Sequence, residues 1–301
     1  MFRENGGLKA RESQMRRELA KQHISTLKNH VLEKALTSSD PALHYQAGLL
    51  FVTPDTKNYD KAAVWFNQAA KGGDPHAKLF LAQIHVASGI PEVMKRAHEL
   101  LLEAATDGVN EAENELGVMH EFGLGVERNL KEAFQWYQRA AASGIAQSQY
   151  NLALMYLDSD YPIHDVFLGI YWLRMAANQN HNQALIALAQ MYERGDNVVQ
   201  DVRKSEKFYV AAAKNADAQA QLQLALRYCR GNGVPQDRRK AVKWMERAAA
   251  QGGGKMSDLA MLCLLEKRKT GKVQRSSTMP TPAAKVRRSK TQVEHRSKYH
   301  V

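Results

Sequence analysis

An internal repeat of 36 residues constrains this chain more than any other feature. Six alanines that close short apolar stretches recur at spacings of 35, 36, 36, 36 and 36 residues: Ala70, Ala105, Ala141, Ala177, Ala213 and Ala249. A fixed period of this length is typical of repeat architectures, whose units cannot bury their apolar faces alone and therefore stack on their neighbours. We expect one extended series of stacked units.

Two further positions keep the register of these alanines. A large apolar residue stands five residues before each alanine: Trp65, Leu100, Trp136, Trp172, Phe208 and Trp244. A small residue stands three residues earlier still: Ala62, Ala97, Ala133, Gly169, Ser205 and Ala241. Residues three and four apart share one face of an α-helix, so the pattern predicts a helix in each repeat. If the large residues are core, Trp136→Ala or Trp172→Ala should cost about 3 to 5 kcal/mol.

An Asn or Asp precedes the large apolar residue by seven positions in five of the six repeats: Asn58, Asn129, Asp165, Asp201 and Asp237. The repeat that holds Leu100 has Val93 instead. Asn and Asp side chains accept hydrogen bonds from the unpaired amides of a first helical turn. We therefore predict that these five residues are N-caps.

A second helix follows the alanine pair after a turn. It repeats a small residue, a leucine and an aromatic residue or histidine, as in Ser148, Leu152 and Tyr156. His85 and His120 take the aromatic position, where a packed histidine is favoured over a metal ligand. A ladder of Met119, Met155 and Met191, one repeat apart, indicates core filling.

The chain divides into three parts. Residues 1–23 are a polar, charged segment, 24–265 hold the repeats with a weaker opening unit and a closing helix over Met256–Leu265, and 266–301 form a basic tail. The tail has 11 Lys and Arg against 2 Glu, a net charge of +9, which leaves only +2 of the total +11 for the rest. Its Ser, Thr, Pro and clustered charge predict disorder.

Composition excludes several classes of protein. No stretch of eighteen apolar residues occurs, and the N-terminus lacks an apolar signal core, so we expect neither a membrane span nor Sec-type export. The two cysteines, Cys229 and Cys263, occupy different repeat positions and are expected to be free thiols. A cytoplasmic location fits best. The alternative is delivery into a host cell by a leaderless secretion route.

These patterns resemble the Sel-one-like repeat (SLR) family, a relative of the tetratricopeptide repeat. The match is strongest in the units ending at Ala141 and Ala249, which carry Gly123-Leu124-Gly125-Val126 and Gly231-Asn232-Gly233-Val234. Residues 158–162 and 195–197 depart from this Gly-x-Gly motif. The resemblance implies an all-α, right-handed superhelical solenoid of about six 36-residue helix-turn-helix repeats that scaffolds protein complexes.

No catalytic motif is found. A phosphate loop, a dinucleotide-binding Gly-x-Gly-x-x-Gly and a His-Glu-x-x-His zinc helix are all absent from the sequence. A single Ser-x-x-Lys, Ser25 to Lys28, lacks the motifs that accompany it in penicilloyl-serine enzymes. We expect no enzyme activity, cofactor, metal or small-molecule substrate.

The resemblance also places a binding groove. In tetratricopeptide proteins the helix with the Leu and Tyr positions lines the concave surface. The polar residues on that helix, together with Asp158 just beyond one of its copies, suit main-chain hydrogen bonds and charge matching to an extended peptide. They are Gln83, Glu121, Gln147, Asp158, Gln183, Gln190, Glu193, Arg194, Gln219 and Arg230. The alternative is that they are ordinary solvated helix faces.

The tail offers a second mode of binding. Its cations could contact nucleic acid, an anionic membrane or an acidic partner, or could simply keep the chain soluble. They include Lys267, Arg268, Lys269, Arg287, Arg288 and Lys290. We predict a non-catalytic protein–protein interaction scaffold that binds a protein or peptide in its groove. The alternative is an electrostatic nucleic-acid or anionic-membrane binder that acts through the tail.

Overall fold

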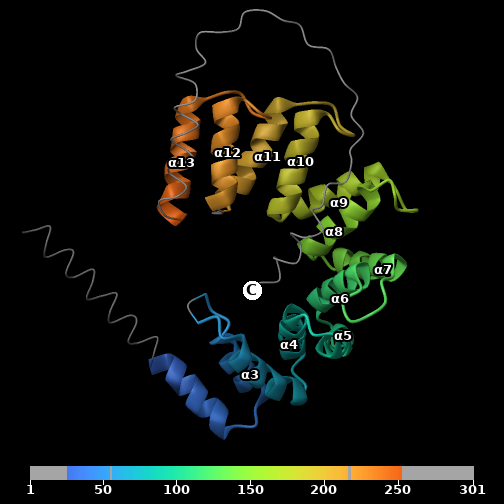
Figure 1. The fold of residues 1–301 in the computed structure, drawn as a ribbon, viewed down its shortest axis with the longest axis vertical. Helices are drawn as coiled ribbons and strands as arrows, with labels where there is room; N and C mark the ends of the chain where they lie inside the picture. Colours follow the sequence, from blue (N-terminus) through green and yellow to red (C-terminus); the bar gives the residue numbers. More distant parts are fainter. Residues whose placement is uncertain (1–25, 55, 216–217, 253–301) are drawn as a thin grey trace, which may run out of the picture. The chain divides into compact units, whose positions relative to one another are not determined.

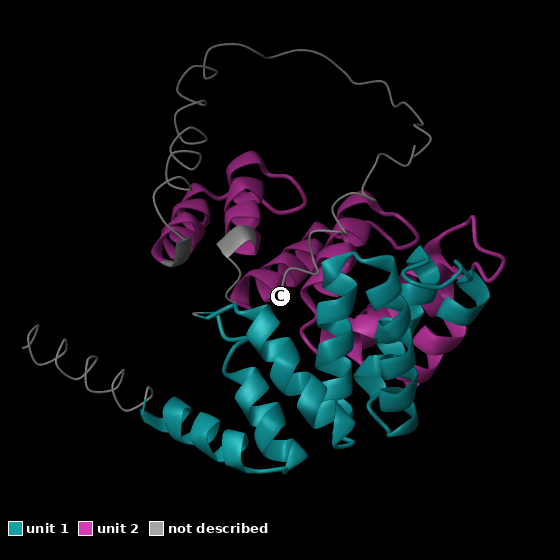
Figure 2. Ribbon diagram, turned by 60° about the horizontal axis from the view of Figure 1, so that its bottom comes forward, with its two compact units in different colours: residues 1–133, 288–301 teal, residues 134–287 magenta. Residues whose placement is uncertain are grey.

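The structure is a computed structural model that describes residues 26–54, 56–215 and 218–252. All regular secondary structure in these ranges is helical (Figure 1), which confirms the predicted all-α repeat fold. The chain forms two compact units, whose boundary between Ala133 and Phe134 falls inside helix α7 (Figure 2). No helix of the described ranges combines the length and the apolar character that a bilayer crossing requires.

The N-terminal unit begins with a helical stretch over residues 26–37. Five further helices follow, and each of the first four packs against the one after it. The helices are α2 (Pro41–Leu49), α3 (Tyr59–Lys71), α4 (Pro75–Ser88), α5 (Pro91–Thr106) and α6 (Asn110–Phe122). The first turns of α7 (Leu130–Ala142) also belong to this unit.

The C-terminal unit contains the rest of α7 and six further helices. From α8 onward each helix packs against the next. They are α8 (Ala146–Leu157), α9 (Val166–Asn178), α10 (Asn182–Arg194), α11 (Val202–Lys214), α12 (Ala218–Arg230) and α13 (Arg238–Gly252). We call α4, α6, α8, α10 and α12 the A helices, and α3, α5, α7, α9, α11 and α13 the B helices.

The small residues of the repeat are buried in all six B helices, as predicted. Their size sets how closely two helices can approach. A Cβ added at Gly169 of α9 would lie 2.5 Å from Cγ of Leu157 on α8. A Cβ at this distance would force the Leu157 side chain to shift, so glycine is the residue that fits this contact without rearrangement.

The large apolar residues are less buried than the pattern predicted. Trp65, Trp136 and Trp172 are only half-buried, and Trp244 alone among the tryptophans is in the core. The next residue in the chain is the fully enclosed one, as in Tyr137 and Leu173. The tryptophan ring instead covers the rim of the core. At Trp136 the guanidinium of Arg139 stacks 4.7 Å from the ring centroid.

All five predicted N-caps are confirmed. In each, the side-chain oxygen accepts a hydrogen bond from a backbone N–H of the first helical turn, at 2.9–3.1 Å for the shortest such bond. The helix without a predicted cap, α5, begins after Ile90 and has no side-chain cap bond. Helix capping thus recurs with the repeat.

The capping residue also closes the loop that precedes each later B helix. The backbone N–H groups of Asn129, Asp165, Asp201 and Asp237 each donate to the carbonyl nine residues earlier, at 2.8–3.0 Å. Where the Gly-x-Gly motif is present, both glycines have positive φ, as at Gly123 and Gly125. Asn197 replaces the second glycine of its repeat and keeps a positive φ of 58°. The described part of 158–162 has no positive φ.

Other expectations about the core are met where the structure describes them. Met119, Met155 and Met191 are buried, and so are His120 and Cys229. His85 is half-buried. The segment 1–23, the closing helix over Met256–Leu265, Cys263 and the tail 266–301 lie outside the described residues.

The observed burial predicts which alanine substitutions in α9 destabilise the protein most. Leu173→Ala should lower the free energy of unfolding by about 2 to 5 kcal/mol, because it leaves a cavity in a closed core. Trp172→Ala should cost less, because its ring is partly solvated. Phe167→Ala, at an exposed site of the same helix, is the control and should change the value by less than about 0.5 kcal/mol. Urea unfolding in which Trp172→Ala costs more than Leu173→Ala would contradict the register.

Candidate partner-binding site

Two of the predicted groove residues lie at equivalent positions, at the starts of two consecutive A helices. Gln147 begins α8 and is exposed, and Gln183 begins α10 and is half-buried. Their repeat equivalent Gln219 lies at the start of α12, but its side chain is outside the described residues. The predicted ladder is therefore seen at two of its three positions.

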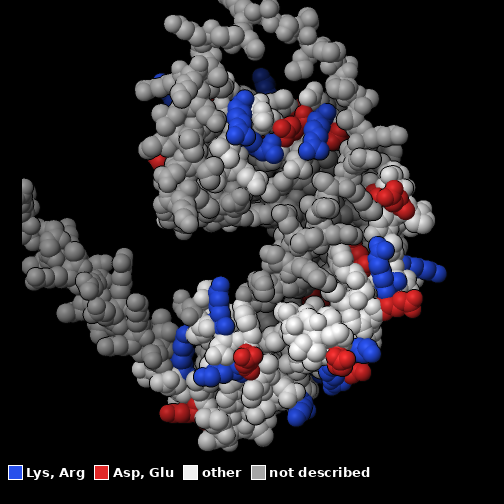
Figure 3. All heavy atoms as spheres, viewed as in Figure 1, with Lys and Arg blue, Asp and Glu red and all other residues white. Residues whose placement is uncertain are grey.

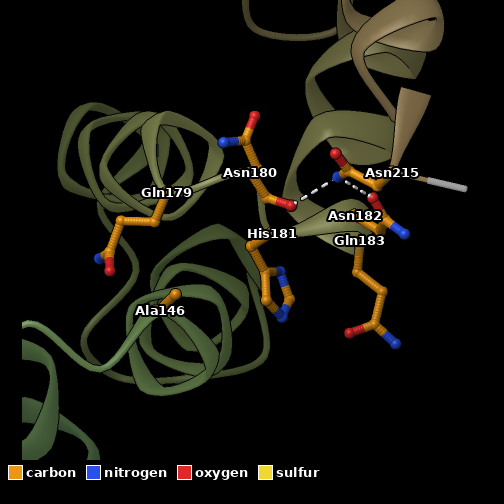
Figure 4. A pocket seen from close by; sticks show the side chains of 7 residues that line it. All are labelled: Ala146, Gln179, Asn180, His181, Asn182, Gln183 and Asn215. Carbon is orange, nitrogen blue, oxygen red and sulfur yellow. Dashed lines mark hydrogen bonds between the residues drawn. The ribbon is translucent and has the colours of Figure 1, made fainter. Parts of the chain in front are cut away.

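A shallow pocket of about 470 Å³ lies between these helix starts (Figure 4). Six of its seven lining side chains are amides or an imidazole. The lining consists of Ala146, Gln179, Asn180, His181, Asn182, Gln183 and Asn215. Side chains of this kind both donate and accept hydrogen bonds without carrying a fixed charge, as a peptide main chain does.

The pocket wall is held by hydrogen bonds between repeats. Asn215 donates from Nδ2 to the carbonyl of Asn180 at 2.8 Å, and Gln179 donates from Nε2 to the carbonyl of Gly144, also at 2.8 Å. Asn180 has a positive φ of 61°, which turns the chain between α9 and α10. These bonds cross from one repeat to the next, so they fix the spacing of the pocket.

His181 links the pocket to Gln147. Its Nδ1 accepts from the backbone N–H of Ala184 at 3.3 Å, so in the neutral ring the proton lies on Nε2. Nε2 then donates to Oε1 of Gln147 at 3.0 Å, and the amide of Gln147 donates onward to Oδ1 of Asn151. The predicted groove residue Gln147 is thus oriented by the neighbouring repeat. In the described part of the chain, no hydrogen-bond partner is seen for the side chain of Gln183.

Glu193 does not have the free carboxylate expected of a residue that reads a ligand. Its Oε2 accepts from the hydroxyl of Tyr209 and from the guanidinium of Arg227, each at 2.7 Å. Arg227 also stacks 4.0 Å from the centroid of the Tyr209 ring. Burial, together with the hydrogen bond to Glu193, raises the pKa of Tyr209 well above its ordinary value. This cluster joins α10, α11 and α12.

The other predicted groove residues have mixed environments. Gln83 donates to Oε1 of Glu115 at 3.4 Å, and the carboxylate of Asp158 accepts from the backbone N–H of Asp160. The remaining four differ in exposure: Glu121 and Gln190 are half-buried, and Arg194 and Arg230 are exposed. Arg194 reaches Asp196 at 3.8 Å. The structure thus places Gln183 in the wall of a pocket and Gln147 beside that wall, and the binding groove stays a prediction. The tail cations lie outside the described residues.

A second cluster of this kind was not anticipated. The hydroxyl of Tyr228 and the ammonium of Lys240 each donate to Oε1 of Glu206 at 2.6 Å. Burial alone would raise the pKa of Glu206, but these two donors outweigh it and lower the pKa. One feature of the sequence could have predicted this cluster. Lys240 lies three residues after the N-cap Asp237, just as Lys204 lies three residues after the N-cap Asp201. Both lysines lie over a tyrosine ring one A helix earlier.

In the third repeat the same positions hold a contact between a histidine and a carboxylate. Glu132 is the equivalent of Lys204, and its Oε2 lies 3.2 Å from Nε2 of His120. Nε2 of His98 on α5 lies 3.3 Å from the same nitrogen. Among the described residues no group of three His, Cys, Asp or Glu side chains is arranged to hold a metal ion. This polar cluster links α5, α6 and α7.

Charged side chains elsewhere form small groups of mixed sign on the face seen in Figure 3. Separately, Lys78 pairs with Glu103 at 3.2 Å and with Asp107 at 2.8 Å. These pairs join an A helix to the B helix that follows. They stabilise the repeats modestly, as partly exposed ion pairs do.

The Sel1 repeat pattern matches six consecutive segments, at residues 42–74, 75–109, 110–145, 146–181, 182–217 and 218–253. The chain belongs to the Sel1 repeat family. Proteins of this family are generally protein–protein interaction scaffolds. Each matched segment from the second onward contains one A helix and the B helix after it.

Solved Sel1 repeat proteins share the fold. A Sel1 repeat protein from Oxalobacter formigenes is 28% identical, with a TM-score of 0.61 over 77% of this chain and 68% of that one. The protective antigen c5321 of uropathogenic Escherichia coli, which has an SLR fold, is 26% identical. Its TM-score is 0.60 over 81% of this chain and 53% of the antigen. The uncharacterized protein NMB1327 of Neisseria meningitidis is 30% identical over 82 residues, which is 27% of this chain and 17% of its own length. This Sel1 repeat chain thus spans a minor part of NMB1327 and about half of c5321.

The histidines predict a dependence of stability on pH. Burial lowers the pKa of His85 and His98, with help from the nearby Arg96 and His120 respectively. Below the ordinary value near 6.5 the unfolded chain therefore takes up protons first, and stability is lost as the pH falls. The free energy of unfolding should decrease between about pH 7.5 and about pH 5.5.

The variant His85→Gln with His98→Gln should flatten this decrease in urea unfolding measured across that range. His164→Gln, at an exposed histidine, is the control and should keep the wild-type slope. A double variant that declines as steeply as the wild type would show that other groups cause the dependence.

Proposed function

We propose that this Sel1 repeat protein is a non-catalytic scaffold that holds an extended segment of a partner protein along its A helices. The observation that supports this most is the amide-lined pocket beside Gln147 and Gln183. Gln179, His181 and Asn215 of its lining are held by bonds between repeats, so they present hydrogen-bonding groups in a preformed array.

The chemistry of the pocket suits a peptide. An extended peptide presents N–H and C=O groups at regular intervals, and amide side chains can satisfy both. Equivalent positions on successive repeats carry Gln147 and Gln183, so the array can continue along the chain. Arg194 and Arg230, also one repeat apart and exposed, would add charge-assisted bonds to acidic side chains of the partner.

The experiment is affinity capture from the native cell with the full chain, followed by titration of the identified and purified partner. The double variant Arg194→Ala with Arg230→Ala should lower the affinity for the partner at least about tenfold, since a hydrogen bond to a charged group contributes roughly 1.5–3 kcal/mol. Gln183→Ala should also weaken it. Gln135→Ala, an exposed amide on a B helix, is the control and should bind normally. Unchanged affinity in all variants with native circular dichroism would refute the A-helix assignment.

The same material tests the alternative in which the tail binds polyanions. Full chain and residues 1–265 are titrated with duplex DNA and with anionic vesicles at low and high salt. Tail binding would be lost on truncation and would fall steeply with salt, because it depends on counterion release. Binding that persists without residues 266–301 would contradict it.

A further inference from the structure

One B helix carries aromatic residues where most of the others carry charge. The two positions are the second and the sixth residue after the N-cap, one helical turn apart. In α9 they are Phe167, with 87% of its surface exposed, and Tyr171, with 51% exposed. The equivalents are Asp60 and Val64 in α3, Lys131 and Gln135 in α7, Arg203 and Lys207 in α11, and Arg239 and Lys243 in α13. Because the repeat is otherwise regular, the aromatic pair is not required by the fold.

The cations at these positions in α11 and α13 have no evident structural role. Arg203, Lys207, Arg239 and Lys243 are exposed, and across the described ranges their side chains form no hydrogen bond or ion pair. The adjacent lysines differ. Lys204 and Lys240 lie over tyrosine rings, and Lys240 also pairs with Glu206. In each of these two repeats one lysine has a structural role, whereas the other four cations are available to a partner.

The three helices are neighbours. Phe208 and Ala212 of α11 pack in one core cluster with Leu173 of α9, and Tyr209 of α11 packs in another with Trp244 of α13. Equivalent side chains on such helices project in similar directions. The shared cores place the aromatic pair of α9 and the four cations of α11 and α13 at equivalent outward positions of consecutive repeats, and we call these six residues the basic–aromatic face.

The charge of this region is concentrated. Residues 201–250 contain 11 Lys and Arg against 5 Asp and Glu, a net charge of +6, although residues 1–265 together carry only +2. A second pocket, of about 420 Å³, lies along α11 in this face. Lys207 and Lys214 flank Val210 and Ala211 in its wall, and Asn180 and Asn215 continue it toward the amide pocket. The acidic residue in its lining, Glu206, is already held by Lys240 and Tyr228.

We propose that the basic–aromatic face docks an acidic segment of a partner protein that carries a bulky apolar side chain at one end. The apolar side chain would pack on Phe167 and Tyr171, and the acidic side chains would pair with the cations of α11 and α13. Exposed aromatic anchors beside complementary charge are typical of specific protein interfaces. The inference rests on the proposed scaffold function, because it names the chemistry of the partner.

Two other classes of partner fit less well. Proteins that bind single-stranded nucleic acid alternate aromatic and cationic side chains along the strand, whereas here they lie on different helices. A membrane-binding face would need apolar residues along its length, and α11 and α13 have cations at the same positions. The segregation of apolar and cationic parts favours a protein segment with the same segregation.

The test is selection from a displayed library of random 12-residue peptides against the full chain. Selected peptides should combine several Asp or Glu residues with one Phe, Leu or Trp near one end. The best of them, fluorescein-labelled, is then titrated by anisotropy. Replacing Arg203, Lys207, Arg239 and Lys243 by Gln should raise its Kd at least tenfold, and Phe167→Ser with Tyr171→Ser should raise it at least fivefold.

Matched controls remove the same charge and the same kind of surface elsewhere. Lys57, Lys71, Lys95 and Lys131 are exposed cations of the N-terminal unit, and Leu36 and Val64 are exposed apolar residues there. Their replacement by Gln and by Ser, respectively, should change the Kd less than twofold. Equal losses in the control and in the four-cation variant would overturn the proposal, because they would indicate an effect of net charge alone.

Other outcomes separate this inference from the proposed function. Selected peptides that lose affinity with Gln183→Ala but not with the four-cation variant would overturn the basic–aromatic face and leave the scaffold function intact. Failure to select any peptide would count against both. Tighter binding of poly(U) or of anionic vesicles than of the selected peptide, lost in the four-cation variant, would overturn the assignment to a protein partner.

Discussion

The close approach of neighbouring helices is the constraint on which the rest of the structure depends. Each B helix buries a small residue, and a Cβ at Gly169 would force the side chain of Leu157 to shift. Because this contact recurs every 36 residues, so do the cap, the loop-closing bond and the buried residue after each large one. The same spacing fixes the distance between equivalent surface positions, and a surface that binds in register with the repeats follows from it.

Residues that depart from the regular register fall into two kinds. One contact joins the aromatic position of an A helix to the third residue after the next N-cap. The residues that make this contact are Tyr192 with Lys204, Tyr228 with Lys240 and, in the third repeat, His120 with Glu132. These variants each preserve a contact inside the repeat. The changes in α9, α11 and α13 differ because they leave aromatic and cationic groups exposed, and we interpret them as adaptations for binding.

The sequence predicted what depends on period. The helices, the caps at Asn58, Asn129, Asp165, Asp201 and Asp237, and the buried methionines follow from spacing alone. The predicted burial was wrong by one residue at Trp65, Trp136 and Trp172, because adjacent positions on a helix differ by about 100° and a wide apolar stripe includes both. The pairing of Glu193 with Tyr209 and Arg227 was also missed. Those residues lie on three helices, and their meeting depends on side-chain reach rather than period.

Amide hydrogen–deuterium exchange of the full chain, with and without a saturating bound segment of the partner, would test the account most directly. The amide pocket and the pocket along α11 share Asn180 and Asn215, so both proposed surfaces meet there. We expect slower exchange on binding at residues 179–183 and 202–214, with little change over 41–106. Protection confined to 41–106, or none despite saturation, would contradict it.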